Sequence, residues 1–256
     1  MSTLTTSYQI PPLTKRFDTQ VTLPGSKSIA LRQLAMSALV NGKTTLRGIP
    51  ECDDIDAMIE CLGNLGAKIQ QRNNELEISG PIDLSDKTVS INARMSGAST
   101  RILIGMAALR KGLTRIDGHE SLRKRTNEPL LNALEQMGCY VKRERGGLPV
   151  EIKGPVMSPG FEIAGNISSQ YVTALLLISP FVNREKSVVI NITGDLVSKP
   201  YIDITVNEMR KRGLRIGWSG SRHLVVESGS YSDGEYSIEG DATAASYFSA
   251  IATIHH

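Results

Sequence analysis

Residues 23–32 read Leu-Pro-Gly-Ser-Lys-Ser-Ile-Ala-Leu-Arg, and the rest of the chain repeats the plan of this short stretch. A β-rich lead-in breaks at Pro-Gly, and an apolar helix is predicted over about residues 28–40. The first backbone N–H groups of a helix have no partner within it, and its N-terminus carries partial positive charge. With Lys27 and Arg32 beside it, this loop is a candidate cradle for a phosphate or a carboxylate. The alternative is a helix capped by Ser26, with two solvated cations.

The same kind of helix opening recurs at a fixed interval. Ser26, Gly97 and Ser168 each precede an apolar stretch of helical length, and they follow one another at intervals of 71 residues. Each apolar stretch is followed by a more amphipathic helix that ends at a glycine, and then by two short alternating strands. The apolar helices are predicted at 29–40, 101–109 and 171–181, and the amphipathic helices at 53–65, 127–137 and 201–212. The chain therefore contains three copies of one unit: strand, buried helix, strand, outer helix and hairpin.

Three such units can close around a pseudo-threefold axis, which gathers the N-termini of the three buried helices at one end. We therefore expect an α/β fold, an inside-out and barrel-like domain of three repeated units over residues 21–229. A fourth opening near Asp241 keeps the period, but its helix reaches the last residues given without a following strand or hairpin. Residues 230–256 are accordingly expected to be the truncated start of a second, similar domain.

Length and composition narrow the class of protein. With 256 residues, 40% of them apolar and 21% charged, the chain can bury a substantial core. A net charge of +3 argues against a nucleic-acid partner bound through bulk charge, but it allows a local site for a small anion. Scattered cysteines without a C-x-x-C pair indicate neither a disulfide framework nor a zinc site, and no apolar run is long enough to cross a bilayer. We expect a cytoplasmic chain with no membrane partner and no bound metal.

Acidic residues gather at the start of the first outer helix. Asp53, Asp54 and Asp56 resemble a metal-binding cluster, but the first turn of any helix favours acids because of its partial positive charge. We interpret them as acids matched to the helix, and Asp241 as the cap of the fourth helix.

Six motifs together resemble the 5-enolpyruvylshikimate-3-phosphate synthase family, also called 3-phosphoshikimate 1-carboxyvinyltransferase. They are LPGSKSIALR at 23–32, SGASTR at 96–101, SLRKR at 121–125, ISSQYVTALLL at 167–177, LVSKPYIDIT at 196–205 and IEGDATAASYF at 238–248. Each motif is weak by itself, but their order and spacing over residues 21–254 are specific.

The resemblance implies a two-domain transferase with substrates bound in the cleft between the domains. Members of the family transfer the enolpyruvyl group of phosphoenolpyruvate to the 5-hydroxyl of shikimate 3-phosphate, by addition and elimination and without metal or organic cofactor. This reaction belongs to the shikimate pathway, which leads to chorismate and the aromatic amino acids. The resemblance also implies that residues 1–20 join the second domain, which would be supplied in cis or in trans.

The motifs carry over ten site residues. Lys27 would contact phosphoenolpyruvate and take part in proton transfer, and Gly97 and Arg125 would face the same substrate. The residues that would bind shikimate 3-phosphate are Ser28 and Arg32, then Ser168 and Ser169 at its phosphate with Ser198 assisting, and Gln170 and Tyr201 along its ring and the transferred group. Purely structural explanations are the alternative to these roles. The basic triplet Arg123-Lys124-Arg125 can be a solvated surface, and Ser168 and Ser169 can simply cap the helix that follows them.

Two departures from the family pattern matter. Met95-Ser96-Gly97-Ala98 stands where many members have Asn-Ala-Gly-Thr, which removes an amide and a hydroxyl that can contact phosphoenolpyruvate. The family's acidic general acid/base and further cationic ligands belong to the second domain, beyond His256. We therefore expect this chain to bind shikimate 3-phosphate weakly without turnover, and its exposed apolar ends to favour self-association.

Two other functions stay open at this stage. One is a non-catalytic anion-binding or assembly module that reuses the fold. The other is the related transferase that acts on UDP-N-acetylglucosamine, whose loop usually reads Gly-Ala-Lys-Asn instead of the Gly-Ser-Lys-Ser found here at 25–28.

Overall fold

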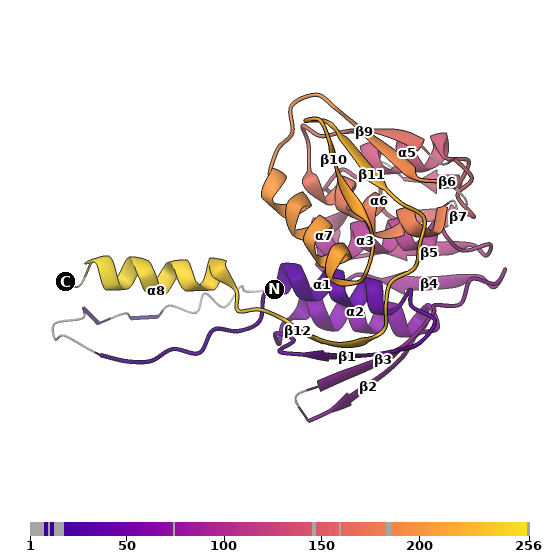
Figure 1. Cartoon of the computed structure of the whole chain (residues 1–256). Helices are drawn as coiled ribbons and strands as arrows, with labels where there is room; N and C mark the ends of the chain where they lie inside the picture. Colours follow the sequence, from indigo (N-terminus) through magenta and orange to yellow (C-terminus); the bar gives the residue numbers. More distant parts are fainter. Residues whose placement is uncertain are drawn as a thin grey trace.

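The computed structural model describes residues 8–9, 11–12, 18–73, 75–144, 147–158, 160–182 and 186–254. Over these residues the chain is an α/β fold with three separate four-stranded mixed sheets and a set of helices packed among them (Figure 1). The expectation that residues 1–20 join a second domain falls largely outside the described residues.

One strand order is common to the three sheets: a parallel pair, then two antiparallel neighbours. The first sheet has the order β12-β1-β3-β2, with β12 at Gly234–Ser237, β1 at Lys43–Arg47, β3 at Glu75–Ser79 and β2 at Lys68–Arg72. The second has β4 (Val89–Asn92), β5 (Thr114–Asp117), β7 (Val150–Lys153) and β6 (Tyr140–Arg143). The third has β8 (Gly160–Ala164), β9 (Val188–Thr193), β11 (His223–Val226) and β10 (Ile216–Ser219).

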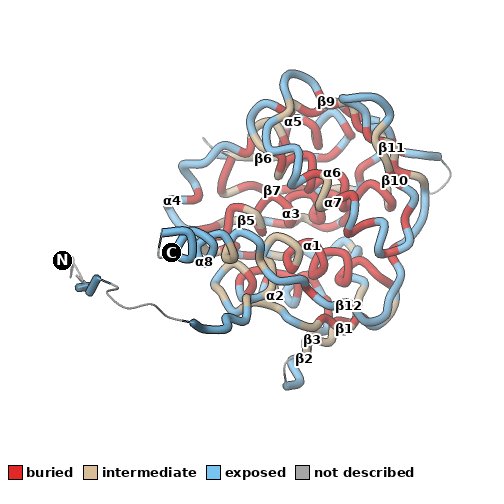
Figure 2. The backbone as a smooth tube through the Cα atoms, turned by 60° about the vertical axis from the view of Figure 1, so that its left-hand side comes forward, coloured by how far each residue is buried: buried red, intermediate tan, exposed pale blue. Residues whose placement is uncertain are grey.

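Three helices are buried around most of their circumference, as their apolar sequences predict. They are α1 (Lys27–Ser37), α3 (Gly97–Ala107) and α6 (Ser169–Val182). The more amphipathic helices α2 (Asp53–Asn64), α5 (Glu128–Gln136) and α7 (Lys199–Lys211) each bury one face, and α4 (Glu120–Arg123) is a single turn. Figure 2 shows the buried residues concentrated on the central helices of the body.

Helices α3 and α6 approach each other closely at Gly105. A Cβ atom at this position would lie 2.8 Å from the carbonyl oxygen of Ala174, nearer than real Cβ atoms come to backbone. Gly105 therefore allows the two backbones to meet, and their N-terminal ends come to the same side of the molecule.

Strand β12 corrects two expectations. The first unit was expected to begin with a strand near residues 21–23, but the described chain has no strand there, and β12 takes that place by pairing with β1 in parallel, Leu46 opposite Tyr236. The N–H of Ile238 also donates to the carbonyl of Arg47 at 2.8 Å. Since β12 lies within 230–256, the three-sheet body continues past the expected boundary at residue 229, to Ile238.

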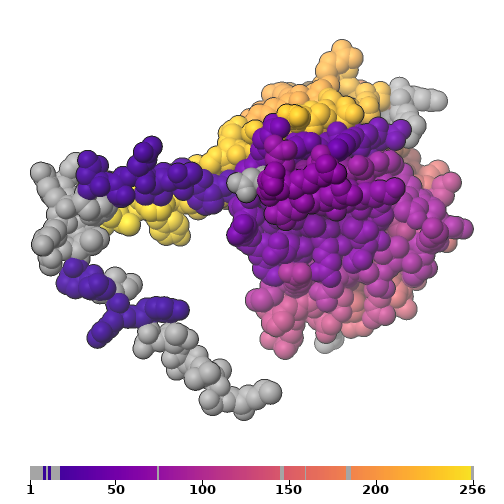
Figure 3. All heavy atoms as spheres, turned by 90° about the horizontal axis from the view of Figure 1, so that it is seen from below, coloured from indigo at the N-terminus to yellow at the C-terminus, as the bar shows by residue number. Residues whose placement is uncertain are grey.

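Beyond this body the chain runs alongside the loop that precedes α1. Gly25 and Gly240 form an antiparallel bridge, and the N–H groups of Ser26 and Asp241 donate at 2.8 Å to the carbonyls of Glu239 and Pro24. Helix α8 (Ala242–Ile254) follows, projects away from the body and has no buried residue (Figures 1 and 3).

A fully buried arginine anchors β12 to the helices. The guanidinium of Arg212, after the end of α7, donates to Gln33 Oε1 at 2.8 Å, Ser37 Oγ at 2.6 Å and the Ser232 carbonyl at 2.8 Å. It also stacks on Tyr236, at 3.7 Å from the ring centre. Burial lowers its pKa, yet these contacts satisfy its donors, so Arg212 joins α1, α7 and the chain that leads into β12.

Replacing Arg212 by methionine should lower the free energy of unfolding by about 3 kcal/mol, because it leaves several buried acceptors without a donor. Urea denaturation followed by circular dichroism measures this loss. The matched control is Arg222→Met, whose side chain is 55% exposed and reaches Asp195 only at 3.7 Å. The control should change stability by less than about 0.5 kcal/mol, and equal effects of the two substitutions would contradict the anchoring role.

Candidate active site

A cavity of about 520 Å³ lies where the N-terminal ends of α1, α3, α6 and α7 converge. All ten site residues predicted from the motifs line it: Lys27, Ser28, Arg32, Gly97, Arg125, Ser168, Ser169, Gln170, Ser198 and Tyr201. Its other lining residues are Leu31, Asp54, Met95, Ala98, Ile102, Ile167, Thr173 and Val197. The fold thus brings residues that lie as far apart in the sequence as Lys27 and Tyr201 to one place.

The helix ends in this cavity present backbone donors and hydroxyls. At α1, Ser26 makes no side-chain cap bond, so the interpretation of Ser26 as a cap is wrong. At α6, Ser168 Oγ accepts from the N–H of Gln170 at 3.3 Å, as a capping serine does. Ser198, before α7, has a φ of 54° and also makes no cap bond. Because the helices start at one cavity, their partial positive charges add there.

Arg32 is a buried cation that forms no ion pair with an acid among the residues that the structure describes. Its side chain is 6% exposed and donates to neutral oxygens, those of Thr205 Oγ1 at 2.7 Å, the Ser28 carbonyl at 2.6 Å and the Tyr201 carbonyl at 2.9 Å. Burial is the main cause that lowers its pKa to about 10. An anion in the cavity would replace part of the solvation that Arg32 has lost.

Two further arginines lie at the end of α3. Arg125 is exposed, and within the described part of the chain its guanidinium has no hydrogen bond or ion pair. Arg101 is 4% exposed, lies behind the lining and donates to Gln170 Oε1 and, at 3.4 Å, to the Thr126 carbonyl. Burial lowers the pKa of Arg101, and the nearby charge of Arg125 lowers it further. Cations therefore outnumber acids here, and the one acid among the lining residues is Asp54.

The sequence interpretation missed Asp54. It was assigned, with Asp53 and Asp56, to the first turn of a helix, and the structure does place all three in the first turn of α2. However, Asp54 also reaches Lys27, with 2.6 Å between Oδ2 and Nζ. No sequence signal distinguishes it from its neighbours, because the contact depends on how α2 packs against α1.

Comparison with known proteins gives a family for this arrangement. The family model of EPSP synthase (3-phosphoshikimate 1-carboxyvinyltransferase) matches residues 13–256. The chain belongs to the EPSP synthase family. A relative from Janthinobacterium sp. (strain Marseille), named 3-phosphoshikimate 1-carboxyvinyltransferase, is 35% identical over 242 residues, which cover 91% of this chain and 55% of the relative. A relative of the same name from Aliivibrio salmonicida is 36% identical over 259 residues, or 97% of this chain and 60% of its own length.

A solved EPSP synthase structure agrees in fold. The enzyme from Acinetobacter baumannii aligns with a TM-score of 0.75 at 24% identity, over 89% of this chain and 51% of that one. The chain therefore spans between half and three fifths of the length of these members of the EPSP synthase family.

No helix among the described residues is long and apolar enough to span a membrane. No group of three or more histidine, cysteine, aspartate or glutamate side chains there is arranged to hold a metal ion, the acids of α2 included.

Gly97 lets the arginines reach the start of α3. A Cβ atom at Gly97 would lie 2.5 Å from Nη1 of Arg125 and 3.2 Å from Nη1 of Arg101. Only glycine leaves room for both guanidinium groups beside the free N–H groups of this helix end.

Gly97→Ala should therefore push the Arg125 guanidinium out of place and weaken binding of inorganic phosphate about fivefold, with the fold retained because the displaced atom ends a flexible side chain. Isothermal titration calorimetry at low ionic strength measures the affinity. Gly63→Ala is the matched control, since a Cβ atom at Gly63 meets nothing within 4 Å. Unchanged phosphate affinity in Gly97→Ala would show that Arg125 does not need this approach.

Proposed function

We propose that this chain is the shikimate 3-phosphate-binding part of a 3-phosphoshikimate 1-carboxyvinyltransferase. One observation carries the proposal: a cavity at converging helix N-termini holds the cations Lys27, Arg32 and Arg125 against a single acid. The two substrates of this reaction bring two phosphates and two carboxylates, so the enzyme must provide an excess of cations and N–H donors. The names of its relatives support the same activity.

Shikimate 3-phosphate binds at the ends of α6 and α7 in this proposal. Ser168 and Ser169 at the start of α6 hold its phosphate, where the helix N-terminus favours an anion, and Ser198 assists from the start of α7. Gln170 and Tyr201 line the ring and the transferred group. The amide of Gln170 is oriented for this, because its Oε1 already accepts from Arg101 and its Nε2 is left as the donor.

Phosphoenolpyruvate binds beside it in the same cavity, at the ends of α1 and α3, where Gly97 and Arg125 face it. Ser28 and Arg32, both in α1, complete the shikimate 3-phosphate site. In the addition step the 5-hydroxyl loses its proton and its oxygen bonds to the central carbon of the enol, while a proton is added to the methylene carbon. In the elimination step the bond from that central carbon to the phosphate oxygen breaks and the new methyl group loses a proton, so the double bond forms again. Lys27, whose Nζ is at the cavity surface, takes part in this proton transfer.

We also infer the finer architecture and the location of the protein. The shared strand order of the three sheets supports an inside-out, barrel-like domain with pseudo-threefold symmetry. Cys52, Cys61 and Cys139 are unpaired, which supports a cytoplasmic location. Helix α8 supports a second domain, because Tyr247, at 70% exposure, and its other apolar residues have no partner in the described chain.

The isolated chain should bind shikimate 3-phosphate with a dissociation constant of about a millimolar, because half of the family's contacts are missing. Calorimetric titration measures it. Ser169→Ala should weaken binding about tenfold by removing one hydroxyl donor to the phosphate. Ser90→Ala, at an exposed position of β4, is the control and should leave it unchanged. A folded chain that binds no shikimate 3-phosphate at several times that concentration would refute the assignment.

Turnover should need the remainder of the family's length. The chain alone should release no phosphate from the two substrates, and adding the C-terminal half of the Aliivibrio salmonicida relative as a separate polypeptide should restore release. Phe248→Asp in α8 should abolish this rescue, because it puts a charge on the apolar docking helix, while Leu84→Asp on the body should not. If the chain instead dimerises through α8 and shows no rescue, self-association is the role of that helix.

A further inference from the structure

The cavity contains one ion pair, and it involves the lysine assigned to proton transfer. Lys27 Nζ lies 2.6 Å from Asp54 Oδ2, with side-chain exposures of 48% and 27%. Both residues line the cavity. The cations Arg32 and Arg125 have no such carboxylate within the described residues, so the pairing of Lys27 is a specific feature and not a general neutralisation of the site.

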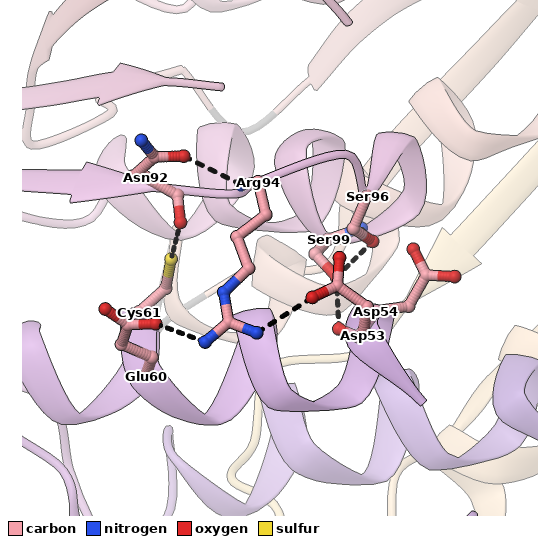
Figure 4. A network of polar contacts seen from close by, with 8 residues as sticks. All are labelled: Asp53, Asp54, Glu60, Cys61, Asn92, Arg94, Ser96 and Ser99. Carbon is pink, nitrogen blue, oxygen red and sulfur yellow. Dashed lines mark hydrogen bonds and ion pairs between the residues drawn. The ribbon is translucent and has the colours of Figure 1, made fainter. Parts of the chain in front are cut away.

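Asp54 is held in place by the loop that starts α3, drawn in Figure 4. Its carbonyl oxygen accepts from Ser99 Oγ at 3.1 Å, and the hydroxyls of Ser99 and Ser96 are 2.7 Å apart. The adjacent Asp53 pairs with Arg94 at 2.8 Å. Hydrogen bonds and an ion pair thus connect the first turn of α2 to the chain at the start of α3. These contacts hold the backbone from which the Asp54 side chain extends toward Lys27.

Arg94 extends this tie along α2. Its Nη2 atom pairs with Glu60 at 2.8 Å, about two helical turns beyond Asp53 in α2 (Figure 4). The φ of Arg94 is 51°, in the left-handed region that few residues other than glycine adopt. The backbone N–H of Arg94 donates to Asn92 Oδ1 at 2.8 Å and its carbonyl accepts from the N–H of His119 at 2.7 Å, so the backbone of this turn before Gly97 is hydrogen-bonded on both sides.

The electrostatics agree with this geometry. The hydrogen bond to Asp54 raises the pKa of Lys27 and outweighs the opposing effect of burial. Burial disfavours the ionised form of Asp54, but hydrogen bonds from Lys27 and Ser96 lower its pKa overall. The other groups that raise the pKa of Lys27 are Cys52, before α2, and Asp241, before α8. Both partners are charged at neutral pH, so Lys27 enters the cavity as an ammonium.

We propose that Asp54 is a positioning residue for Lys27: its carboxylate holds the ammonium protonated at the cavity surface until an anionic substrate replaces part of that contact. Asp54 occupies the place of a ligand carboxylate or phosphate oxygen. Lys27 therefore begins the reaction as a proton donor and not as a base. The substrate chemistry rests on the proposed function, whereas the role of Asp54 toward Lys27 does not.

Competitive acetylation measures the pair without any substrate. Trace acetic anhydride reacts only with the free amine, so labelling of Lys27 between about pH 7 and about pH 11, read by peptide mass spectrometry, gives its titration. Asp54→Asn should shift this titration to lower pH and raise labelling at neutral pH about tenfold, because a larger fraction of Lys27 is then the free amine. Asp54→Glu should restore slow labelling in part, because it returns the charge with a longer side chain.

Asp56→Asn is the matched control. It removes an acid from the same first turn of α2, at an exposed position that does not contact Lys27, and should leave the labelling of Lys27 as in the wild type. Equal labelling in Asp54→Asn, Asp56→Asn and the wild type, with all three folded by circular dichroism, would overturn the proposal. A change shared by both variants would attribute it to net charge and would also overturn it.

A second arm separates this inference from the proposed function. Phosphoenolpyruvate with shikimate 3-phosphate should protect Lys27 from acetylation in the wild type, and in Asp54→Asn the protection should be lost at lower pH than in the wild type. Faster labelling of Asp54→Asn without protection by either compound would keep the Asp54 role and refute the substrate assignment. Protection with the same pH dependence in both proteins would keep the substrate assignment and refute the role of Asp54.

Discussion

Close packing of α3 against α6 is the constraint on which the cavity depends. The two helices meet at Gly105, where any side chain would press against the backbone at Ala174. This contact sets how far apart Gly97 and Ser169 lie, at the starts of the two helices. The effect of a helix dipole falls off within about one turn of the helix end, so the two N-terminal ends must be this close for their partial charges to sum on one ligand.

The second constraint is the free-energy cost of burying cations that lose their hydration without forming an ion pair. Arg32 and Arg101 are almost fully buried and bond to neutral oxygens, and burial lowers the pKa of each. The fold tolerates this because other parts are fully satisfied, as the contacts of Arg212 illustrate. Desolvated donors fixed in advance are what an enzyme needs for a highly charged substrate, since no reorganisation is then required when it binds.

Regular spacing is what made the sequence informative. The openings at Ser26, Gly97 and Ser168 recur at one interval, so they predicted the buried helices and the meeting of their N-termini, while the ten residues that line the cavity were predicted from the motifs shared with the family. Asp54 escaped because its role depends on the packing of α2 on α1, and sequence spacing holds no information on that. Arg101, which is not among those ten residues, donates to Gln170 Oε1 and so orients that amide.

Strand β12 was missed for a different reason. Four residues with little apolar character give a weak strand signal, and their partner β1 lies near the other end of the chain. Local patterns report on neighbours within a unit, whereas this pairing closes the first unit with residues that follow the third. The end of the body was therefore placed too early, although the three hairpins inside it were predicted correctly.

The parallel pairing of β1 with β12 also has a consequence for biosynthesis. A ribosome makes β1 early and β12 only after all three hairpins, so the edge of β1 emerges with its backbone groups unpaired. Contacts so distant along the chain form slowly, and an open edge during that time can pair with another nascent chain. The first sheet of this protein is thus the last to be completed. Its open edge at β1 is the part of the nascent chain that most needs protection from pairing with other chains.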